Sequence, residues 1–273
     1  MKVITKEEFD NFPIINGYKQ CPSGDYSQIT HFTDKCNFED FSKFGNNCIF
    51  HDESIFGYYC TFGYNCTFGK KCLFKGSNIF DRCCSFGFNC NFHSACTFKE
   101  KCQFDTSCAF NSGCKFGSFC KFDGWCKFES YCEFGDNCTF LEGCIFGSKC
   151  NFDRNIYLGN LCSFGQYCNF GNSCTFGEGC HFEKQCRFEK GHVAKDGYPL
   201  LGFSGFGTMN RTTYFFNCTD GIWVRCGCFF GDIEQFRKQV KKTRKGRIKK
   251  EYLMIADLVK MKWKKIRCKN DCI

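Results

Sequence analysis

Thiols are the side chains whose number and spacing first suggest chemistry. The chain has 273 residues, 29 of them cysteine, and Cys occupies 22 of the 26 positions that follow one another every six residues from Cys36 to Cys186. The four exceptions are Ser42, Ser54, Asn78 and Ile156. A regular thiol array can bind metal or act as a redox store, whereas a buried Cys is simply a small apolar side chain. Because the sequence has no Cys-x-x-Cys, we expect free, core-lining thiols and no cofactor.

A second group of thiols lies near the C-terminus, outside the six-residue register. Zinc is commonly held by four Cys or His side chains. The candidate ligands are Cys218, Cys226, Cys228, Cys268 and Cys272. Their spacing differs from that of known zinc fingers, so ordinary core or surface cysteines are the alternative.

The five histidines are candidates for acid–base chemistry. His51 and His93 each follow a Phe of the repeat, where a solvated turn residue is expected. His192 comes just after the last regular repeat and is the candidate general base of an acyl transfer. The sequence shows no clustered histidine set that would bind a catalytic metal.

The repeat itself predicts the elements that position these residues. Two residues after each repeat position stands Phe in 25 of 26 cases, with Leu158 as the exception, and no residue is inserted or deleted. Successive side chains of a strand point to opposite sides, so Cys and Phe of a Cys-x-Phe unit face inward together. Gly follows this position in 12 of 26 repeats, which indicates a short strand and then a turn. A helical period cannot keep these residues on one face.

The unit resembles the hexapeptide repeat of left-handed parallel β-helices. The resemblance rests on segments such as Phe44-Gly45-Asn46-Asn47-Cys48 and Phe134-Gly135-Asp136-Asn137-Cys138. It implies a mainly β fold of about 8–9 three-sided coils of 18 residues. Members of that family include acyltransferases, typically trimers that use a catalytic His and an acyl-CoA. Because no loop interrupts the repeat here, a scaffold or interaction protein is the preferred interpretation and an acyltransferase the alternative. A cysteine-rich metal or redox protein is a second alternative.

An 18-residue coil predicts an aromatic stripe on one outward side. The stripe consists of Phe41, Tyr59, Tyr131 and Tyr167, interspersed with Ser77, Ala95, Gly113, Lys149 and Gln185. Exposed aromatic side chains are enriched at interfaces. We therefore expect either a face for self-association or an incidental pattern, and Phe119 and Trp125 on other sides weaken a single-face interpretation.

The chain ends lack the regular repeat. We expect residues 1–31 to form an N-terminal cap that uses Phe9, Phe12 and Ile14, residues 32–190 the β-helix, and residues 191–217 a closing cap or linker. Residues 218–273 should form a small α+β module, with a strand at 222–229, a helix from Ile233 to about Lys242 behind Asp232 as N-cap, a basic loop at 243–249 and a helix at about 250–265.

Two short segments near these ends carry a further resemblance. Cys21-Pro22-Ser23-Gly24-Asp25-Tyr26 and Cys226-Gly227-Cys228-Phe229 resemble end modules of hexapeptide proteins carried by phages and prophages. That resemblance brings no known activity.

Charge is concentrated in the last 41 residues. Residues 233–273 contain 15 Lys and Arg and 4 acids, whereas residues 1–232 contain 22 and 24. This asymmetry predicts an anionic partner, either nucleic acid or an acidic protein, and a solvated basic helix pair is the alternative. The residues expected to bind it are Arg237, Lys241, Lys242, Arg244, Lys245, Arg247, Lys249 and Lys250.

Composition limits the class of protein. A hydrophobic share of 43% with 24% charged residues argues against disorder, and the absence of an 18-residue apolar run argues against a membrane span. The segment Met1–Phe9 lacks the apolar core of a signal peptide. We therefore expect a cytoplasmic protein with reduced thiols.

Overall fold

The computed structural model describes residues 1–195, 199–207 and 212–263. The chain divides into two compact units, Met1–Gly191 and His192–Ile273. The first unit is a β-solenoid, and the second combines a sheet with two helices.

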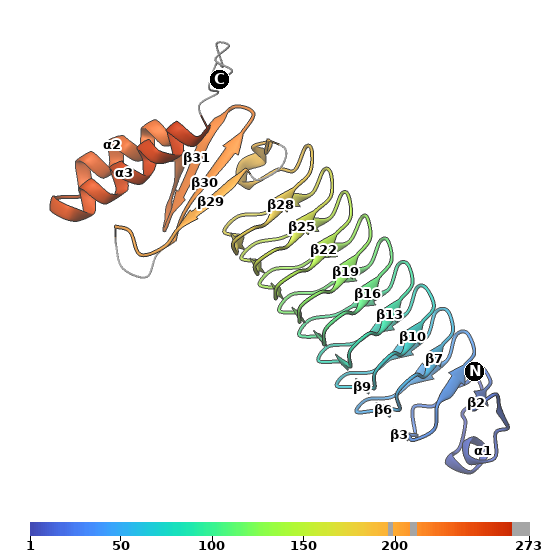
Figure 1. Ribbon diagram of the computed structural model, residues 1–273. Helices are drawn as coiled ribbons and strands as arrows, with labels where there is room; N and C mark the ends of the chain where they lie inside the picture. The colour runs from blue at the N-terminus through green and yellow to red at the C-terminus, as the bar shows by residue number, and fades with distance from the viewer. Residues whose placement is uncertain (196–198, 208–211, 264–273) are drawn as a thin grey trace. The chain divides into compact units, whose positions relative to one another are not determined.

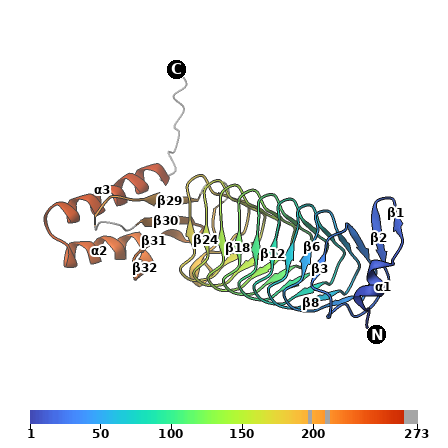
Figure 2. The same cartoon turned by 90° about the horizontal axis from the view of Figure 1, so that it is seen from below.

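The solenoid consists of short parallel strands stacked coil upon coil, as Figures 1 and 2 show. Each hexapeptide contributes one strand, and strands 18 residues apart pair in register, as Phe74 does with Phe92. Three sheets result, and their strands follow in chain order. The first sheet comprises β1 (Ile14–Ile15), β2 (Tyr18–Cys21), β4 (Cys36–Phe38), β7 (Ile55–Phe56), β10 (Leu73–Phe74), β13 (Asn91–Phe92), β16 (Ala109–Phe110), β19 (Lys127–Phe128), β22 (Ile145–Phe146), β25 (Ser163–Phe164) and β28 (His181–Phe182). The second comprises β5 (Lys43–Phe44), β8 (Thr61–Phe62), β11 (Ile79–Phe80), β14 (Thr97–Phe98), β17 (Lys115–Phe116), β20 (Glu133–Phe134), β23 (Asn151–Phe152) and β26 (Asn169–Phe170). The third comprises β3 (His31–Phe32), β6 (Ile49–Phe50), β9 (Thr67–Phe68), β12 (Ser85–Phe86), β15 (Gln103–Phe104), β18 (Lys121–Phe122), β21 (Thr139–Phe140), β24 (Tyr157–Leu158) and β27 (Thr175–Phe176).

Phenylalanine rings fill the interior of the coils. Rings of successive coils stack face to face, as Phe74 and Phe92 do with centroids 4.7 Å apart and planes 4° from parallel. Rings on neighbouring sides meet edge to face, as Phe74 and Phe80 do at 5.2 Å and 83°. Both are favourable arrangements of aromatic quadrupoles. The structure confirms the predicted mainly-β solenoid, with about nine three-sided coils.

Each corner of the coil requires an unusual backbone conformation. From position 41 to position 185, the residue before each repeat position adopts the left-handed region, as Asn47 does with φ +58°. Its N–H donates to the neighbouring coil, in this case to the Tyr64 oxygen at 2.9 Å. Asn and Gly tolerate this region, whereas bulky side chains enter it at a free-energy cost.

The N-terminal residues close the first coil. Helix α1 (Lys6–Asp10) begins behind Thr5 with a capping box to Glu8. Phe9 is buried and meets Phe32 edge to face at 5.3 Å, so its predicted covering role is confirmed. The same prediction is wrong for Ile14, which is exposed because β1 pairs only with β2 in an antiparallel hairpin.

The second unit is an antiparallel sheet with a helical hairpin. The sheet order is β29 (Leu200–Phe203), β30 (Thr213–Cys218), β31 (Gly221–Cys226) and β32 (Phe229–Asp232). The sheet begins at Leu200, so the segment predicted as a cap or linker (191–217) contains β29 and most of β30. This segment belongs to the sheet because its Phe215 lies in the core of this unit. A short 3₁₀ turn, η1 (Glu189–Gly191), ends the first unit.

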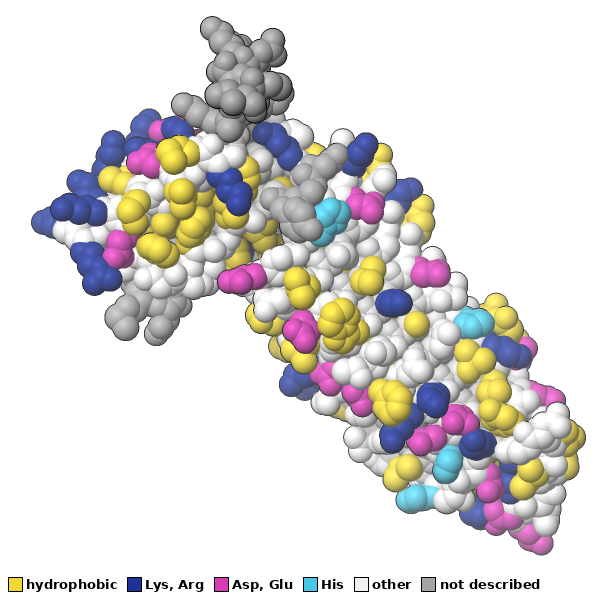
Figure 3. Space-filling model, viewed as in Figure 1, with side chains coloured by type: hydrophobic (Ala, Val, Ile, Leu, Met, Phe, Trp, Pro, Cys, Tyr) yellow, Lys and Arg dark blue, Asp and Glu magenta, His cyan; other side chains and the backbone are white. Residues whose placement is uncertain are grey.

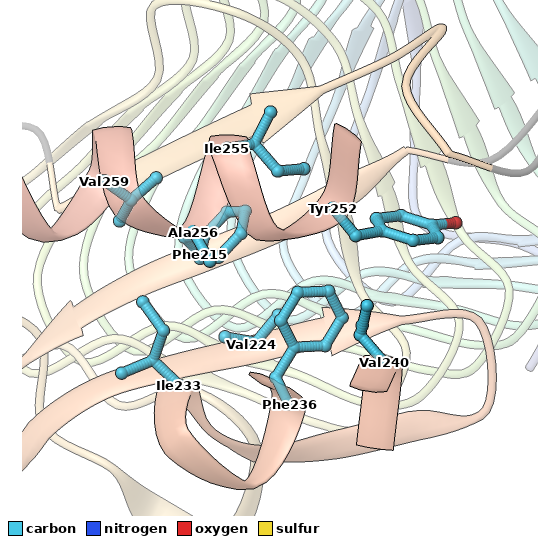
Figure 4. Packing of buried hydrophobic residues seen from close by; sticks show 9 residues of the cluster. All are labelled: Phe215, Val224, Ile233, Phe236, Val240, Tyr252, Ile255, Ala256 and Val259. Atoms are coloured by element: carbon cyan, nitrogen blue, oxygen red, sulfur yellow. The ribbon is translucent and has the colours of Figure 1, made fainter. Parts of the chain in front are cut away.

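Helices α2 (Ile233–Thr243) and α3 (Gly246–Trp263) pack together. Asp232 caps α2 and forms a capping box with Gln235, as predicted. The predicted basic loop at 243–249 is wrong at both ends, because Thr243 ends α2 and residues 246–249 belong to the first turn of α3. Phe215 and Val224 of the sheet pack with Phe236 of α2 and Tyr252 of α3, as Figure 4 shows. Within the described residues, no helix is long and apolar enough to cross a membrane.

Candidate functional site

The cysteines of the repeat form hydrogen-bonded columns inside the solenoid. Between paired strands, backbone N–H groups donate to the carbonyl oxygens of Cys and Phe, as the Thr67 N–H does to the Cys48 oxygen at 2.8 Å. The carbonyl oxygen of the residue after Phe accepts a hydrogen bond from a Cys thiol instead. Cys84 Sγ donates to the Gly63 oxygen at 3.4 Å, and Cys108 Sγ donates to the Gly87 oxygen at 3.5 Å. The same bond, reaching back 21 residues, recurs from coil to coil.

Three of the four residues that replace Cys also have a side-chain donor, but they donate to the carbonyl oxygen three residues earlier, not to the one 21 residues earlier. Ser42 Oγ donates to the Glu39 oxygen at 2.8 Å, and Ser54 Oγ donates to the His51 oxygen at 3.0 Å. Asn78 Nδ2 donates to Lys75 in the same way at 2.5 Å. Only Ile156 lacks a donor. The columns therefore select small hydrogen-bond donors, a role that the sequence analysis missed although the identity of these replacements signals it.

Burial suppresses thiolate formation at Cys60, one thiol of the columns. Desolvation raises the pKa of Cys60 to about 12, above the range where a thiol reacts as thiolate near neutral pH. Among the described cysteines, all are free, and Cys83 and Cys228 are the exposed ones. The described residues contain no group of three His, Cys, Asp or Glu side chains placed to hold a metal ion.

Two of the proposed zinc ligands, Cys218 and Cys226, lie at opposite ends of one β-hairpin. Cys226 pairs with Thr213 at one end of the β30–β31 hairpin, whereas Cys218 pairs with Gly221 at the other. Five strand residues separate Thr213 from Cys218, about 16 Å at the usual rise per residue. One zinc ion cannot take both Cys218 and Cys226, and Cys218 is buried while Cys228 is exposed. Cys268 and Cys272 lie outside the described residues.

His192 is held in a polar and aromatic setting. Its Nδ1 lies 2.8 Å from Asp220 Oδ2, and its ring stacks on Trp223 with centroids 3.6 Å apart. Trp223 Nε1 donates to the other Asp220 oxygen at 3.1 Å. Burial opposes ionisation of Asp220, but the hydrogen bonds from His192 and Trp223 outweigh it and lower the pKa of this carboxyl. A carboxylate that orients an imidazole is one element of general-base catalysis.

The aromatic stripe lies along one corner of the solenoid. Its four members are all about half exposed and all adopt the left-handed conformation. Phe41 and Tyr59 stack at 5.1 Å and 9°. Tyr131 lies under the Lys149 ammonium, whose Nζ is 4.9 Å from the ring centroid and 2.8 Å from the hydroxyl oxygen. Tyr167 stands apart, so the stripe consists of separate aromatic groups.

The predicted basic residues divide into two sets. Arg237 is paired with Asp257 and Glu234, and Arg247 is paired with Glu251 at 2.5 Å. The other six surround the turn between α2 and α3, and within the described residues they make no ion pair: Lys241, Lys242, Arg244, Lys245, Lys249 and Lys250. We call these six the basic turn. Figure 3 shows Lys and Arg side chains gathered at the end of the helical hairpin where α2 connects to α3.

A surface hollow at another corner escaped the sequence analysis. It has a volume of about 430 Å³ and includes Trp125, Leu141 and Tyr157. Leu141 follows Trp125 by 16 positions, and Tyr157 follows Leu141 by another 16. The six-residue period alone does not show that turn and strand positions of different coils meet. The glycines at 124, 143 and 159 are the sequence feature that could have indicated this hollow.

The likeness to hexapeptide β-helices and to phage-type end modules stays a resemblance carried by the segments quoted for it. Comparisons of the chain with protein-family models, curated proteins and solved structures find no match.

Proposed function

We propose that the protein is a non-enzymatic scaffold of the hexapeptide-repeat type, working in a reducing compartment such as the cytoplasm. Its solenoid is the rigid part, and its C-terminal unit binds an anionic partner through the basic turn. The partner that we propose is nucleic acid. The observation that carries this proposal is the group of six cations without a partner among the described residues.

The placement of these cations favours a polyanion. Lys241 and Lys242 occupy the last turn of α2, where the helix dipole already favours positive charge. Arg244 and Lys245 follow in the connection, and all four side chains are exposed. Fully solvated lysines suit phosphate contacts, which depend on charge and carry no sequence information. We therefore propose binding without base preference.

Binding of the full chain to fluorescent duplex DNA and single-stranded RNA at low salt tests the proposal. The variant with Lys241, Lys242, Arg244 and Lys245 all changed to Gln should lose most of the binding. A matched control replaces four exposed solenoid lysines with Gln: Lys71, Lys101, Lys127 and Lys184. Equal losses in the two variants would show a general charge effect, and absence of binding by the unmodified chain would end the proposal.

The aromatic stripe supports self-association as a second property of the scaffold. Stacked, exposed rings such as Phe41 and Tyr59 offer apolar area of the kind that is enriched at interfaces. We propose that copies of the chain associate through this corner, an outer face of the solenoid.

Acyl transfer from acyl-CoA is the alternative function, and the His192–Asp220 pair is the observation that favours it. An oriented imidazole can accept the proton of an attacking hydroxyl or amine. Release of free CoA from acetyl-CoA, measured with the unmodified chain and with His192→Ala, separates this function from the scaffold. His192-dependent release would replace our proposal.

A further inference from the structure

The hollow that contains Trp125 is formed by corners of successive coils in the third sheet. Its walls come from the turns that follow β15, β18, β21 and β24, and from Tyr157 of β24 itself. The residues that carry the argument below are Asp123, Trp125, Leu141, Glu142 and Tyr157.

Two aromatic side chains and one aliphatic side chain give the hollow an apolar surface. Trp125 is 55% exposed, Tyr157 48% and Leu141 45%. Here a Trp, a Leu and a Tyr side chain that each expose about half of their area line one hollow. Such concentrations commonly mark binding sites.

Glycines make room for this surface. A Cβ on Gly143 would lie 2.6 Å from Cε3 of Trp125, so the indole lies across the corner of the next coil. A Cβ on Gly159 would lie 2.7 Å from the Leu141 carbonyl carbon. Trp125 itself adopts φ +63°, a conformation that is unfavourable for a bulky side chain.

The same hollow carries negative charge. Asp123 and Glu142 both line it, and Asp105 occupies the position of Asp123 one coil earlier. Desolvation and the Asp105 carboxylate raise the pKa of Asp123. Within the described residues no ion pair neutralises any of these three carboxylates. A bound cation would relieve their repulsion.

We infer that this hollow binds an organic ammonium cation with an apolar stem, with the nitrogen between Asp123 and Glu142 and the stem against Trp125 and Tyr157. Aromatic faces attract ammonium groups, and carboxylates add a Coulombic contribution. The same carboxylates repel anions and favour no neutral ligand. The ammonium group can belong to a free amine or to a lysine side chain of a partner.

The tryptophan in the hollow provides a direct readout. The chain has three Trp residues, so 5-fluorotryptophan labelling of the full chain gives three fluorine resonances. The Trp125→Phe variant identifies the resonance of Trp125. We expect n-butylammonium to shift that resonance saturably, whereas 1-butanol and butyrate leave it in place.

Charge variants test the role of the carboxylates. Asp123→Asn with Glu142→Gln should weaken n-butylammonium binding about fivefold or more. The matched control is Asp153→Asn, because Asp153 also follows the Phe of its repeat, is also exposed and also has a pKa raised mainly by desolvation, but lines a different part of the surface. This control should bind as the unmodified chain does.

Two further probes separate the sources of the ammonium group. Spermidine represents a free amine, and the blocked peptide acetyl-Gly-Lys-Gly-amide represents a lysine side chain. Tighter binding of either one supports the inference and identifies the source. An equal shift with 1-butanol, unchanged affinity in the double variant, or no saturable shift with any cation would overturn it.

Discussion

The thiol of Cys84 donates a hydrogen bond to the Gly63 carbonyl oxygen, 3.4 Å away and 21 residues earlier in the chain. The bond joins one coil to the preceding one from inside the solenoid. A buried carbonyl that loses its partner destabilises the fold by about 1–3 kcal/mol. The columns of cysteines therefore serve the backbone as well as the packing around the Phe rings.

Substitutions at Cys108 distinguish these two roles. Cys108→Ser replaces the thiol that bonds the Gly87 oxygen with a hydroxyl donor. Ser42 and Ser54 show that a hydroxyl fits at this repeat position, where it bonds the carbonyl oxygen three residues earlier. The change should therefore lower the free energy of unfolding by less than about 1 kcal/mol. Cys108→Ala removes the donor and leaves a small cavity, so a loss of about 1–3 kcal/mol is expected. Denaturant unfolding measures both.

Cys83→Ala is the control for Cys108, because Cys83 is exposed and its loss should change stability by less than about 0.5 kcal/mol. If Cys108→Ala were no less stable than Cys108→Ser, the hydrogen bond would contribute nothing and only packing would matter.

Buried thiols should also make the fold sensitive to alkali. The pKa of Cys60 is raised from 9.0 to about 12 in the folded chain by desolvation. Above pH 9 the unfolded chain releases this proton while the folded chain keeps it, so stability falls as pH rises from about 9 to about 12. Each thiol whose pKa is raised in this way should lower the free energy of unfolding by about 1.4 kcal/mol per pH unit in that interval.

Denaturant midpoints measured between pH 7 and pH 11 should thus decline above pH 9. Cys60→Ser should decline less steeply, since a Ser hydroxyl does not titrate there. A midpoint independent of pH up to 11 would contradict the assigned burial effect.

The solenoid could be predicted from the sequence because its period is uninterrupted. Each Cys-x-Phe unit fixes two inward side chains, and the 18-residue coil followed from the resemblance. The hydrogen bond from Cys84 could not be foreseen, because a spacing of 21 residues acquires meaning only when the corners are built. The hollow at Trp125 depends in the same way on how Gly143 admits the indole.

The C-terminal unit was less predictable than the solenoid. The helix behind Asp232 follows from a capping box that is local in sequence. The strand at Leu200–Phe203 is defined by its pairing with β30. No repeat or alternating pattern in the sequence between the two strands indicates that they pair. That Cys218 and Cys226 cannot share one zinc ion could not be predicted either, because their proximity in sequence hides their separation along the hairpin.

The aromatic stripe predicts opposite effects of substitution on stability and on association. Tyr59 and Tyr167 adopt φ +58° and +61°, where Asn is better tolerated than Tyr. Tyr59→Asn with Tyr167→Asn should leave stability unchanged or raise it by up to about 1 kcal/mol. If the stripe is an interface, sedimentation velocity should show that the same variant associates less.

Lys71→Asn with Lys101→Asn is the matched control, because both lysines adopt the same conformation at the two corners outside the stripe. It should gain similar stability and associate as the unmodified chain does. A loss of stability in the tyrosine variant would show that the rings stabilise the fold, and unchanged association would remove the stripe as an interface.

The basic turn predicts a specific salt dependence. Each phosphate contact releases condensed counterions, so the logarithm of the binding constant for duplex DNA falls linearly with the logarithm of salt concentration. Removal of the four exposed charges at Lys241, Lys242, Arg244 and Lys245 should reduce the slope by about three to four if each contacts a phosphate. Titrations of the full chain at several salt concentrations measure the slope. Because Arg247 is already paired with Glu251, Arg247→Gln should reduce it by less than one unit. If Arg247→Gln reduced the slope as much as the four-residue variant does, the phosphate contacts would lie elsewhere on α3.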